Sequence, residues 1–366
     1  MPKFHKYVDI TIPVEACNFR CHYCYIWQCK NMDRNNSVFK YSAEHVAKGL
    51  SKERLGGICL MNICGIGETL FSQYTIDLAR HLLKQGHFII IVTNGCAQDS
   101  SYEQLAKFPD ELTHRLLVKF SFHYLELKRL NLFEKYWQHI HMIKDSGCSI
   151  SIEFCPSDEA MPHKDDIKAM CLKEVGALPH VTNARVNTSK EFELMTKLSV
   201  EEYKVFWGDF DSEMFDIKIE SFAKKRSTFC YAGDWSVYLN AGTGHMFQCH
   251  CGETISDDVF QDINKPFPTK IVGQCRAPYC INAHCGMCMG CLPDCDVQTF
   301  CSTRDRICTD GTHWLSPDWI EFSSQKLYDN NQRLSRAKER EIIKSVTNKK
   351  TKHRHSFWWH VRHMNF

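Results

Sequence analysis

The chain has 366 residues, of which 43% are hydrophobic, and its formal net charge is +2. This length allows one large domain and a smaller one, and the small net charge does not indicate a polyanion-binding protein. The sequence has no run of about 18 apolar residues, which a membrane span would need. Its first residues show no apolar segment followed by a cleavage site, so a signal peptide is not expected. The sequence therefore predicts a cytoplasmic protein with no membrane partner.

Cysteine is strongly enriched, with 21 residues. Disulfide scaffolds are usually short and secreted, and neither property is expected here. Cytosolic proteins with many thiols more often bind metal or carry out redox chemistry. The cysteine content therefore favours metal binding over disulfides.

The first half of the chain alternates short apolar strands with helices. Strands are expected over residues 7–13, 57–64, 87–93, 115–122, 148–154 and 180–187. Helices are expected over 43–55, 71–85, 100–108, 126–146 and 163–175, and four of them stop at a glycine, which closes helix ends easily. This alternation favours right-handed crossovers and a parallel sheet. We expect an α/β fold, either a partial (β/α)6 TIM-like barrel or an open doubly wound sheet, with ligands at the C-terminal ends of the strands.

The pattern changes near Asp209, and 11 of the 21 cysteines lie between Cys230 and Cys308. So many thiols with little periodicity indicate a small region nucleated by metal rather than by an apolar core. A basic helix is expected over 328–346, followed by a tail rich in Lys, Arg, His and Trp, with Trp358 and Trp359. The tail could bind an acidic or phosphorylated partner, but a solvated helix with a frayed end is the simpler interpretation. Nucleic acid is not expected as a partner, because no RNA-binding module is recognisable.

Three cysteines lie close together directly after the first expected strand, in the segment Cys17-Asn-Phe-Arg-Cys21-His-Tyr-Cys24. Thiolates are soft ligands that suit zinc or iron–sulfur clusters. Structural zinc is normally closed by four ligands, whereas three cysteines leave one iron of a [4Fe–4S] cluster open. A zinc site stays an alternative if His22 or Cys29 supplies the fourth ligand.

The C-x3-C-x2-C spacing, with Tyr23 before the last cysteine, resembles the signature of the radical S-adenosylmethionine superfamily. In that family the open iron is chelated by the amino and carboxylate groups of S-adenosylmethionine. The resemblance implies reductive cleavage of this cofactor to a 5′-deoxyadenosyl radical, which abstracts hydrogen from an unactivated carbon. It also implies an external electron donor such as flavodoxin or ferredoxin.

Further segments after the next strands fit this resemblance, which covers roughly residues 7–190. Residues 64–69, Cys-Gly-Ile-Gly-Glu-Thr, resemble the family's Gly-Gly-Glu motif with Ile66 inserted, and Thr93-Asn94-Gly95 resembles a turn common in the family. Taken alone, Asn-Gly is usually only a turn, and Glu153 could equally be a buried, paired carboxylate. The cofactor-binding residues that the resemblance implies are Tyr23, Gly65, Gly67, Glu68, Asn94, Ser121 and Glu153.

The second cysteine-rich region resembles the SPASM extension of radical enzymes, which carries two auxiliary [4Fe–4S] clusters. Cys230 and Gly244-His-Met-Phe-Gln-Cys249 fit its C-x9-15-G-x4-C element, but the following C-x2-C-x2-C-x3-C run has two residues where the family has five. The resemblance implies Cys230, Cys249 and Cys295 for the first auxiliary cluster, with Cys251 as a further candidate, and Cys285, Cys288 and Cys291 for the second, completed by Cys301 or Cys308. Cys275 and Cys280 are left unassigned. A zinc-ribbon-like module and a single auxiliary cluster stay alternatives.

These resemblances divide the chain into a radical core domain (1–215), an auxiliary-cluster domain (216–320) and a basic C-terminal helix and tail (321–366). SPASM-type enzymes mostly modify peptides or protein side chains by cross-linking, epimerisation or oxidation, so we expect a peptide substrate. Only 16 residues precede Cys17, so no N-terminal leader-binding domain is expected. A dehydrogenase, epimerase or dehydratase for a sugar or aminocyclitol is the alternative enzyme. A non-catalytic iron–sulfur or zinc protein that senses redox state or binds RNA is the alternative of another class.

Catalytic residues are not assigned by the sequence. Four side chains near the expected strand ends could donate hydrogen or act as a base, although packing in the core is the commoner role for each: Cys96, His123, Tyr124 and Cys155.

Overall fold

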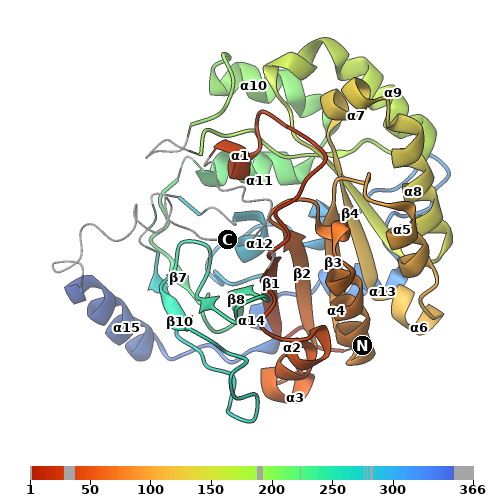
Figure 1. The fold of residues 1–366 in the computed structure, drawn as a ribbon. Coiled ribbons are helices and arrows are strands. Elements are labelled where there is room, and N and C mark those ends of the chain that lie inside the picture. Colours follow the sequence, from red (N-terminus) through yellow and green to blue (C-terminus); the bar gives the residue numbers. More distant parts are fainter. Residues whose placement is uncertain are drawn as a thin grey trace.

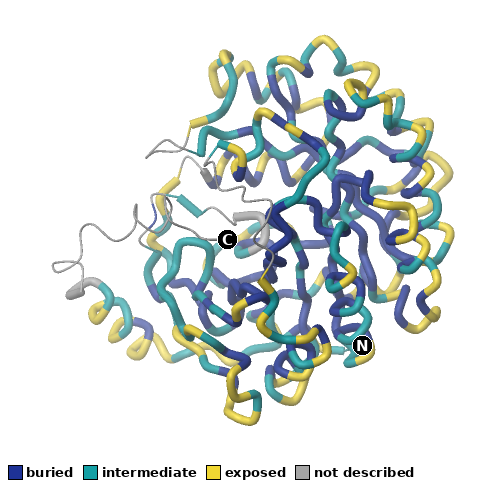
Figure 2. Tube along the Cα trace, in the orientation of Figure 1, coloured by how far each residue is buried: buried dark blue, intermediate teal, exposed yellow. Residues whose placement is uncertain are grey.

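Six parallel strands form the centre of the protein. The structure is a computed structural model that describes residues 2–28, 38–187, 193–222, 224–275, 277, 279–280 and 283–349. The six strands follow one another in chain order in the sheet (Figure 1): β1 (Lys6–Ile12), β2 (Cys59–Gly65), β3 (Phe88–Thr93), β4 (Leu116–Phe122), β5 (Ser149–Phe154) and β6 (His180–Val181). They are mostly apolar, as expected for a parallel sheet covered on both faces, and Figure 2 shows them in the buried centre. The predicted α/β fold with a partial six-stranded barrel is confirmed.

Helices connect these strands, and Figure 1 shows α5, α8 and α9 on the outer side of the sheet. Their apolar faces pack on the strands, which explains why the sequence alternates helical and strand periodicity. The helical elements of this half are α1 (Tyr25–Gln28), α2 (Ala43–Gly49), α3 (Lys52–Leu55), η1 (Thr69–Phe71), α4 (Gln73–Lys84), α5 (Asp99–Ala106), α6 (Asp110–Thr113), α7 (Tyr124–Leu130), α8 (Phe133–Asp145), η2 (Asp158–His163) and α9 (Lys164–Val175).

Two of the expected helices are each broken into two. The helix expected over 43–55 stops before Ser51, whose hydroxyl caps α3 by accepting from the N–H of Arg54 (3.3 Å). The helix expected over 126–146 is interrupted at Asn131, which has a left-handed φ of 55°. As predicted, α3 and α9 end at glycines with positive φ, Gly56 (84°) and Gly176 (72°).

The sixth strand is much shorter than the expected 180–187. Only His180 and Val181 pair with β5, because β5 itself ends at Phe154. Pro156 follows closely, and proline has no N–H with which to extend a ladder.

The cysteine-rich half adds strands to the same sheet. β8 lies parallel to β1, with Tyr7 opposite Ser236 and Thr11 opposite Asn240, and the antiparallel β9 and β10 complete that edge. The sheet order is therefore β10-β9-β8-β1-β2-β3-β4-β5-β6, so the sheet itself extends past the boundary predicted near residue 215. The remaining elements are α10 (Val200–Trp207), η3 (Gly208–Phe210), α11 (Glu213–Phe222), β7 (Phe229–Cys230), β8 (Ser236–Asn240), β9 (Met246–Phe247), β10 (Thr254–Ser256), β11 (Gly273–Gln274), α12 (Ala283–Cys288), η4 (Cys301–Thr303), α13 (Pro317–Ser323), α14 (Leu327–Asn330) and α15 (Arg336–Lys349).

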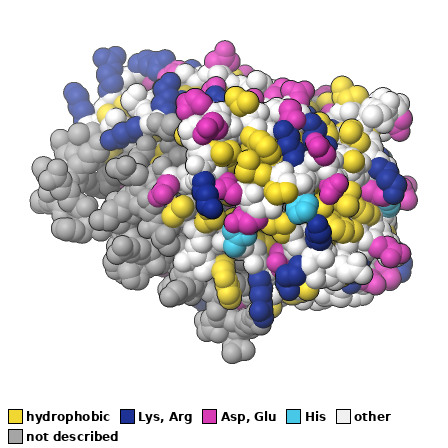
Figure 3. Space-filling model, turned by 90° about the horizontal axis from the view of Figure 1, so that it is seen from above, with side chains coloured by type: hydrophobic (Ala, Val, Ile, Leu, Met, Phe, Trp, Pro, Cys, Tyr) yellow, Lys and Arg dark blue, Asp and Glu magenta, His cyan; other side chains and the backbone are white. Residues whose placement is uncertain are grey.

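The basic helix expected over 328–346 begins later, at Arg336, after the short α14. Residues 350–366 of the tail, including Trp358 and Trp359, lie outside the described residues. Within the described ranges, none of the helices combines the length and the apolar character needed to cross a bilayer. Figure 3 shows acidic and basic side chains interspersed over the face seen from above, in keeping with the small net charge.

Candidate active site

The loop after β1 brings the three predicted cluster cysteines to one cavity. Cys17, Cys21 and Cys24 all line it, and the backbone N–H of Cys24 donates to the carbonyl of Cys21 (3.0 Å). Burial, with smaller contributions from Glu68 and Cys24, raises the pKa of Cys17 to about 11. Such a thiol stays protonated at neutral pH unless a metal ion displaces its proton. Three soft thiol donors on one cavity, rather than their pKa, make the loop a candidate metal site.

The Gly-Ile-Gly-Glu segment after β2 packs directly against this cluster loop. The N–H of Gly67 donates to the carbonyl of Val14 (2.5 Å), and the N–H of Glu68 donates to the carbonyl of Ala16 (2.8 Å). A Cβ atom on Gly67 would lie 2.2 Å from the Ala16 carbonyl oxygen, closer than any real contact. Glycine is therefore required at residue 67, and the segment fixes the position of the cluster loop.

Glu68 joins the ends of β2 and β3. Its side chain is buried, with Oε1 accepting from the Thr93 hydroxyl (2.6 Å) and the Leu70 N–H (3.0 Å), and Oε2 accepting from the Asn94 N–H (2.7 Å). Burial raises the pKa of Glu68, and these donors act in the opposite direction. A carboxylate offers about four acceptor positions. Donors of the protein use three of them, which leaves one for a ligand. Glu68 also lines the cavity.

Asn94 connects the Thr-Asn-Gly turn to the cluster loop. Its side-chain nitrogen donates to Asn18 Oδ1 (2.7 Å) and lies 3.8 Å from the sulfur of Cys17. Asn18 in turn donates to the carbonyl of Cys96 (3.0 Å). Hydrogen bonds to ligand sulfurs tune the potential of iron–sulfur clusters, so the Asn94 contact matches a cluster environment.

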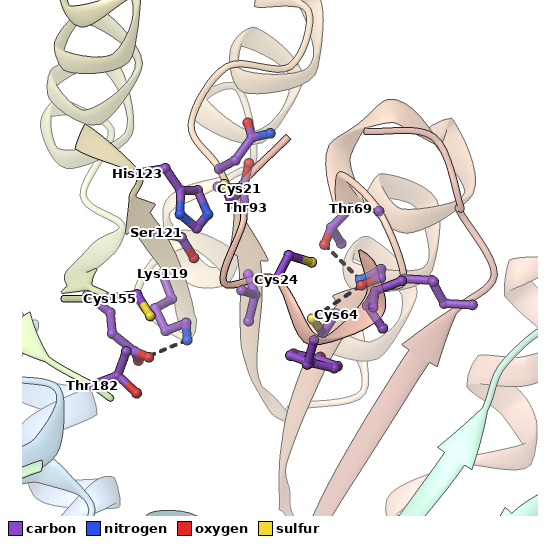
Figure 4. A pocket seen from close by; sticks show the side chains of 18 of the residues that line it. Cys21, Cys24, Cys64, Thr69, Thr93, Lys119, Ser121, His123, Cys155 and Thr182 are labelled. Atoms are coloured by element: carbon purple, nitrogen blue, oxygen red, sulfur yellow. Dashed lines mark hydrogen bonds and ion pairs between the residues drawn. The ribbon is translucent and has the colours of Figure 1, made fainter. Parts of the chain in front are cut away.

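Tyr23 and Ser121 line the cavity beside His123 on the β4 side. The Tyr23 hydroxyl lies 2.8 Å from His123 Nδ1, and burial lowers the pKa of His123 to about 4. The imidazole is therefore neutral at pH 7 and can accept the phenolic hydrogen. Figure 4 shows Ser121 on β4 above Lys119, and His123 directly after the end of that strand.

Glu153 lines the cavity but is surrounded by cations. Lys119 Nζ lies 3.0 Å and Arg304 Nη1 3.2 Å from its Oε2, and Lys218 Nζ lies 3.5 Å from its Oε1. The alternative interpretation of Glu153 as a buried, paired carboxylate therefore describes its geometry. Lys218 and Arg304, the two cations from the second half of the chain, are not marked by any local sequence pattern. Lys119 interrupts an apolar strand two residues before Ser121, and this polar residue in an apolar strand could have pointed to its role.

The cavity has a volume of about 410 Å³, within the usual range of about 300–1,000 Å³ for small-molecule sites. Tyr25 and Trp27, which follow the last cluster cysteine, line it while remaining 40% and 46% exposed. An exposed aromatic edge of this kind is typical of a binding surface. Of the four unassigned strand-end residues, His123 and Cys155 line the cavity. The lining residues in the described part of the chain do not include Cys96 or Tyr124.

His250 of the cysteine-rich half also lines the cavity, where it contacts Asp9 of β1, and neither residue was predicted from the sequence. Asp9 Oδ2 lies 2.8 Å from His250 Nε2, and its Oδ1 accepts from the Asn62 side chain (2.8 Å). His250 lies between Cys249 and Cys251, so this contact joins the cysteine-rich segment to β1. Asp9 is the single acid in the apolar strand β1, and this sequence feature could have pointed to the contact.

Six cysteines of the second half influence one another electrostatically, including the two that were left unassigned. Among the described residues, no three His, Cys, Asp or Glu side chains are grouped closely enough to hold a single metal ion. Burial is the main cause that raises the pKa of four of them, Cys230, Cys249, Cys251 and Cys275. Neighbouring thiols contribute: Cys291 and Cys280 act on Cys230, and Cys275 acts on both Cys249 and Cys251. The value for Cys249 is raised to about 12. The group consists of Cys230, Cys249, Cys251, Cys275, Cys280 and Cys291.

The other predicted auxiliary ligands are distributed differently. Cys288 and Cys295 lie in the same apolar cluster as Cys230, Cys249, Cys280 and Cys291. Cys301 lies against Ser323 and Ser324, and the side chain of Cys285 lies outside the described residues. Cys308 lies elsewhere: its thiol donates to the Val175 carbonyl (3.2 Å) and packs on Gly176 in the core of the barrel half. Of the two predicted alternatives for the last ligand, this packing favours Cys301 over Cys308.

The donor sets fit the clusters that the sequence predicts. At the cluster loop Cys17, Cys21 and Cys24 all line one cavity, and their three thiols would hold the cluster. In the second half six thiols and little regular structure fit a metal-nucleated region. Soft thiolate sets of this kind suit iron–sulfur clusters or zinc.

No known family model matches the sequence, and no similar sequence is found among curated proteins. Solved structures do match. Streptococcus suis SuiB superposes with a TM-score of 0.53 and 13% identity, over 74% of this chain and 67% of SuiB, and SuiB bound to S-adenosylmethionine gives 0.52 over the same shares. Native anSMEcpe with bound AdoMet gives a TM-score of 0.51 and 14% identity, over 93% of this chain and 99% of anSMEcpe. At these identities the likeness is one of fold alone: this chain shares the fold of SuiB and anSMEcpe.

Proposed function

We propose that this protein is a radical S-adenosylmethionine enzyme whose [4Fe–4S] cluster is held by Cys17, Cys21 and Cys24. One observation carries the proposal: the three cysteines, the Gly-Ile-Gly-Glu segment and Asn94 meet at the wall of one cavity. The fold shared with SuiB and anSMEcpe, each solved with this cofactor bound, supports it.

When bound, the cluster and S-adenosylmethionine supply a reductive cleavage that yields a 5′-deoxyadenosyl radical. The protein's own residues bind and position. Gly67 lets the backbone approach the cluster loop, Glu68 holds Asn94 in its turn, and Asn94 directs an N–H toward the Cys17 sulfur. The cofactor-binding wall continues through Gly65 and Tyr23 to Ser121, and Glu153 lies beyond it, paired with cations.

The test is reductant-dependent formation of 5′-deoxyadenosine by protein reconstituted without oxygen. We expect wild-type protein to bind iron and cleave S-adenosylmethionine, and the triple variant Cys17→Ala, Cys21→Ala, Cys24→Ala to do neither. Cys148→Ala is the matched control, because Cys148 is a buried thiol outside the cavity lining. Fully reconstituted wild-type protein that cleaves no cofactor would refute the proposal.

The six mutually interacting cysteines of the second half hold at least one auxiliary iron–sulfur cluster in this proposal. Iron and acid-labile sulfide are the measurement: about eight irons per chain support one auxiliary cluster and about twelve support two, at four irons each. About four irons together with zinc would instead support the zinc-ribbon alternative. The division into a core of residues 1–215 and a cluster region of 216–320 belongs to the same proposal.

The substrate class that we propose is a peptide. The resemblance to SPASM-type enzymes supports it, and so do the exposed aromatic rings of Tyr25 and Trp27 beside the cavity, which offer a surface for an extended chain. The reaction consumes one electron per cleavage, so a flavodoxin or ferredoxin is the expected donor. Stimulation of 5′-deoxyadenosine formation by peptides but not by sugars is the expected outcome, and the reverse selectivity would favour the sugar or aminocyclitol alternative.

A further inference from the structure

Three cationic side chains meet on one carboxylate at the side of the cavity formed by β4, β5 and the segment after β6. Lys119 Nζ, Lys218 Nζ and Arg304 Nη1 lie 3.0, 3.5 and 3.2 Å from the oxygens of Glu153. Their side chains are only 14%, 8% and 4% exposed. Lys218 also donates to the hydroxyl of Thr182. We call this group of Lys119, Glu153, Lys218 and Arg304, with the adjacent Asn183, the cationic recess.

The recess carries more positive than negative charge. Among the described residues, three cations face one carboxylate, and buried charge that is not balanced is costly. The described part of the cavity lining shows the same excess, with five Lys or Arg side chains, Arg20, Lys119, Arg185, Lys218 and Arg304, against the three acids Asp9, Glu68 and Glu153. An anion bound at the recess would balance this charge.

Two hydrogen-bond donors at the recess also lack acceptors. Among the described residues, neither Asn183 Nδ2 nor Arg304 Nε has a hydrogen-bond partner, although both atoms are buried. Both residues are more than nine-tenths buried, at 8% and 4% exposure, and both line the cavity. A buried donor without an acceptor costs free energy, so these two atoms independently indicate that an acceptor belongs there.

We propose that the cationic recess binds a carboxylate of the substrate, so that the peptide of the proposed function carries an acidic side chain or its C-terminal carboxylate close to the modified residue. The inference rests on that proposed function. An unmodified peptide has carboxylates as its only anions, and a carboxylate accepts strong, charge-assisted hydrogen bonds from Lys and Arg.

The carboxylate of S-adenosylmethionine is a second source of the same chemistry. Figure 4 shows Lys119, Cys155 and Thr182 across the pocket from Cys64 and Thr69. Lys119 still acts electrostatically on the Cys64 thiol, and both Lys218 and the cluster cysteine Cys24 act on the Cys155 thiol. The two sources are therefore distinguished by experiment.

The experiment compares two pools of dye-labelled, terminally capped hexapeptides that differ only at one fixed position, Glu in one pool and Gln in the other. Binding to reconstituted holoenzyme with S-adenosylmethionine is followed by fluorescence anisotropy. We expect wild-type protein to bind the Glu pool about tenfold more tightly, the factor of a charge-assisted hydrogen bond. Lys119→Met should reduce the preference to about threefold or less by removing one cation, and Glu153→Gln should increase it by removing the competing carboxylate.

The opposite signs of these two effects distinguish anion binding from damage to the fold, which would weaken binding in both variants. Lys48→Met is the matched control, because Lys48 is a surface side chain (63% exposed) outside the cavity lining, and it should keep the wild-type preference. Equal binding of the two pools, no binding of either, or an unchanged preference in Lys119→Met would overturn the inference.

Equilibrium dialysis of S-adenosylmethionine separates the two carboxylate sources. Its affinity should be the same for wild-type and Lys119→Met protein, and a loss in the variant with no change in pool preference would reassign the recess to the cofactor and overturn the inference. Formation of 5′-deoxyadenosine without peptide tests the proposed function separately, so failure of one is not mistaken for failure of the other.

Discussion

The contact between Gly67 and the cluster loop gives the most direct test of how the site is built. Replacing Gly67 with alanine adds one methyl group that would lie 2.2 Å from the Ala16 carbonyl oxygen and 2.7 Å from that of Glu15. Both obstacles are backbone atoms, so no side chain can rotate away to relieve the clash. The two segments must separate, and the hydrogen bonds from the N–H groups of Gly67 and Glu68 to Val14 and Ala16 lengthen or break.

The cost has two parts. Overpacking against a rigid neighbour costs about 1–3 kcal/mol, and each lost hydrogen bond adds about 1 kcal/mol. We therefore expect Gly67→Ala to lower the free energy of unfolding by about 3–5 kcal/mol, a large fraction of the roughly 5–15 kcal/mol that keeps a domain folded. Because the displaced segment carries Cys17, the variant should also bind less iron.

The assays are urea unfolding followed by circular dichroism and iron content after anaerobic reconstitution. Gly208→Ala is the matched control, since a Cβ atom there meets nothing within 4 Å and the residue has a helical φ of −68°. A Gly67→Ala protein within about 0.5 kcal/mol of wild type, the usual range of neutral surface changes, and with full iron content would refute the argument that the two loops are locked together.

Three other outcomes follow from particular contacts. Glu68→Gln should cost about 1–3 kcal/mol, because in either orientation its NH2 group faces a backbone N–H, that of Asn94 or that of Leu70, which leaves two buried donors opposed. Urea unfolding of this variant beside an exposed Glu44→Gln control measures the loss. His87 is buried, and burial lowers its pKa to about 4, so the unfolded chain takes up a proton on this histidine before the folded protein does as the pH falls. The free energy of unfolding should therefore drop by about 3 kcal/mol between pH 6.5 and 4. The variant His87→Asn should be less stable at neutral pH and should lose this part of the pH dependence. Cys249→Ser should lower the iron content by about four atoms per chain, the iron of one cluster, whereas Cys308→Ser should leave the iron content unchanged. Equal losses of iron in the two variants would contradict the division between ligand thiols and packing thiols.

The cluster loop, the Gly-Ile-Gly-Glu segment and the Thr-Asn-Gly turn could be predicted because each is a local pattern placed at the end of a strand. The strands of a parallel sheet share one direction, so their C-terminal ends meet at one edge, and Cys17, Glu68 and Asn94 had to come together. The residue requirement at Gly67 follows from a contact with a carbonyl far away in the chain, which no local pattern specifies.

The features that the sequence left open depend on contacts between distant segments. Arg304 reaches Glu153 across 151 residues, and Lys218 reaches it across 65. The thiols of Cys275 and Cys280 are separated from Cys249 by irregular chain, so spacing could not assign them. Cys308 shows the reverse case, because its spacing suits a ligand while its packing on Gly176 makes it part of the core.

The sheet order explains how one cavity can be built from both halves of the chain. A partial barrel of six strands has two edges, at β1 and at β6, and the cysteine-rich half reaches both. At the first edge β8 pairs with β1, and the segment of Cys249 and Cys251 places His250 against Asp9. At the other, Arg304 lies against Glu153 on β5, next to the short β6. The second half is therefore part of the cavity wall, and a truncation that removed it would expose the cations and acids of the barrel interior to water.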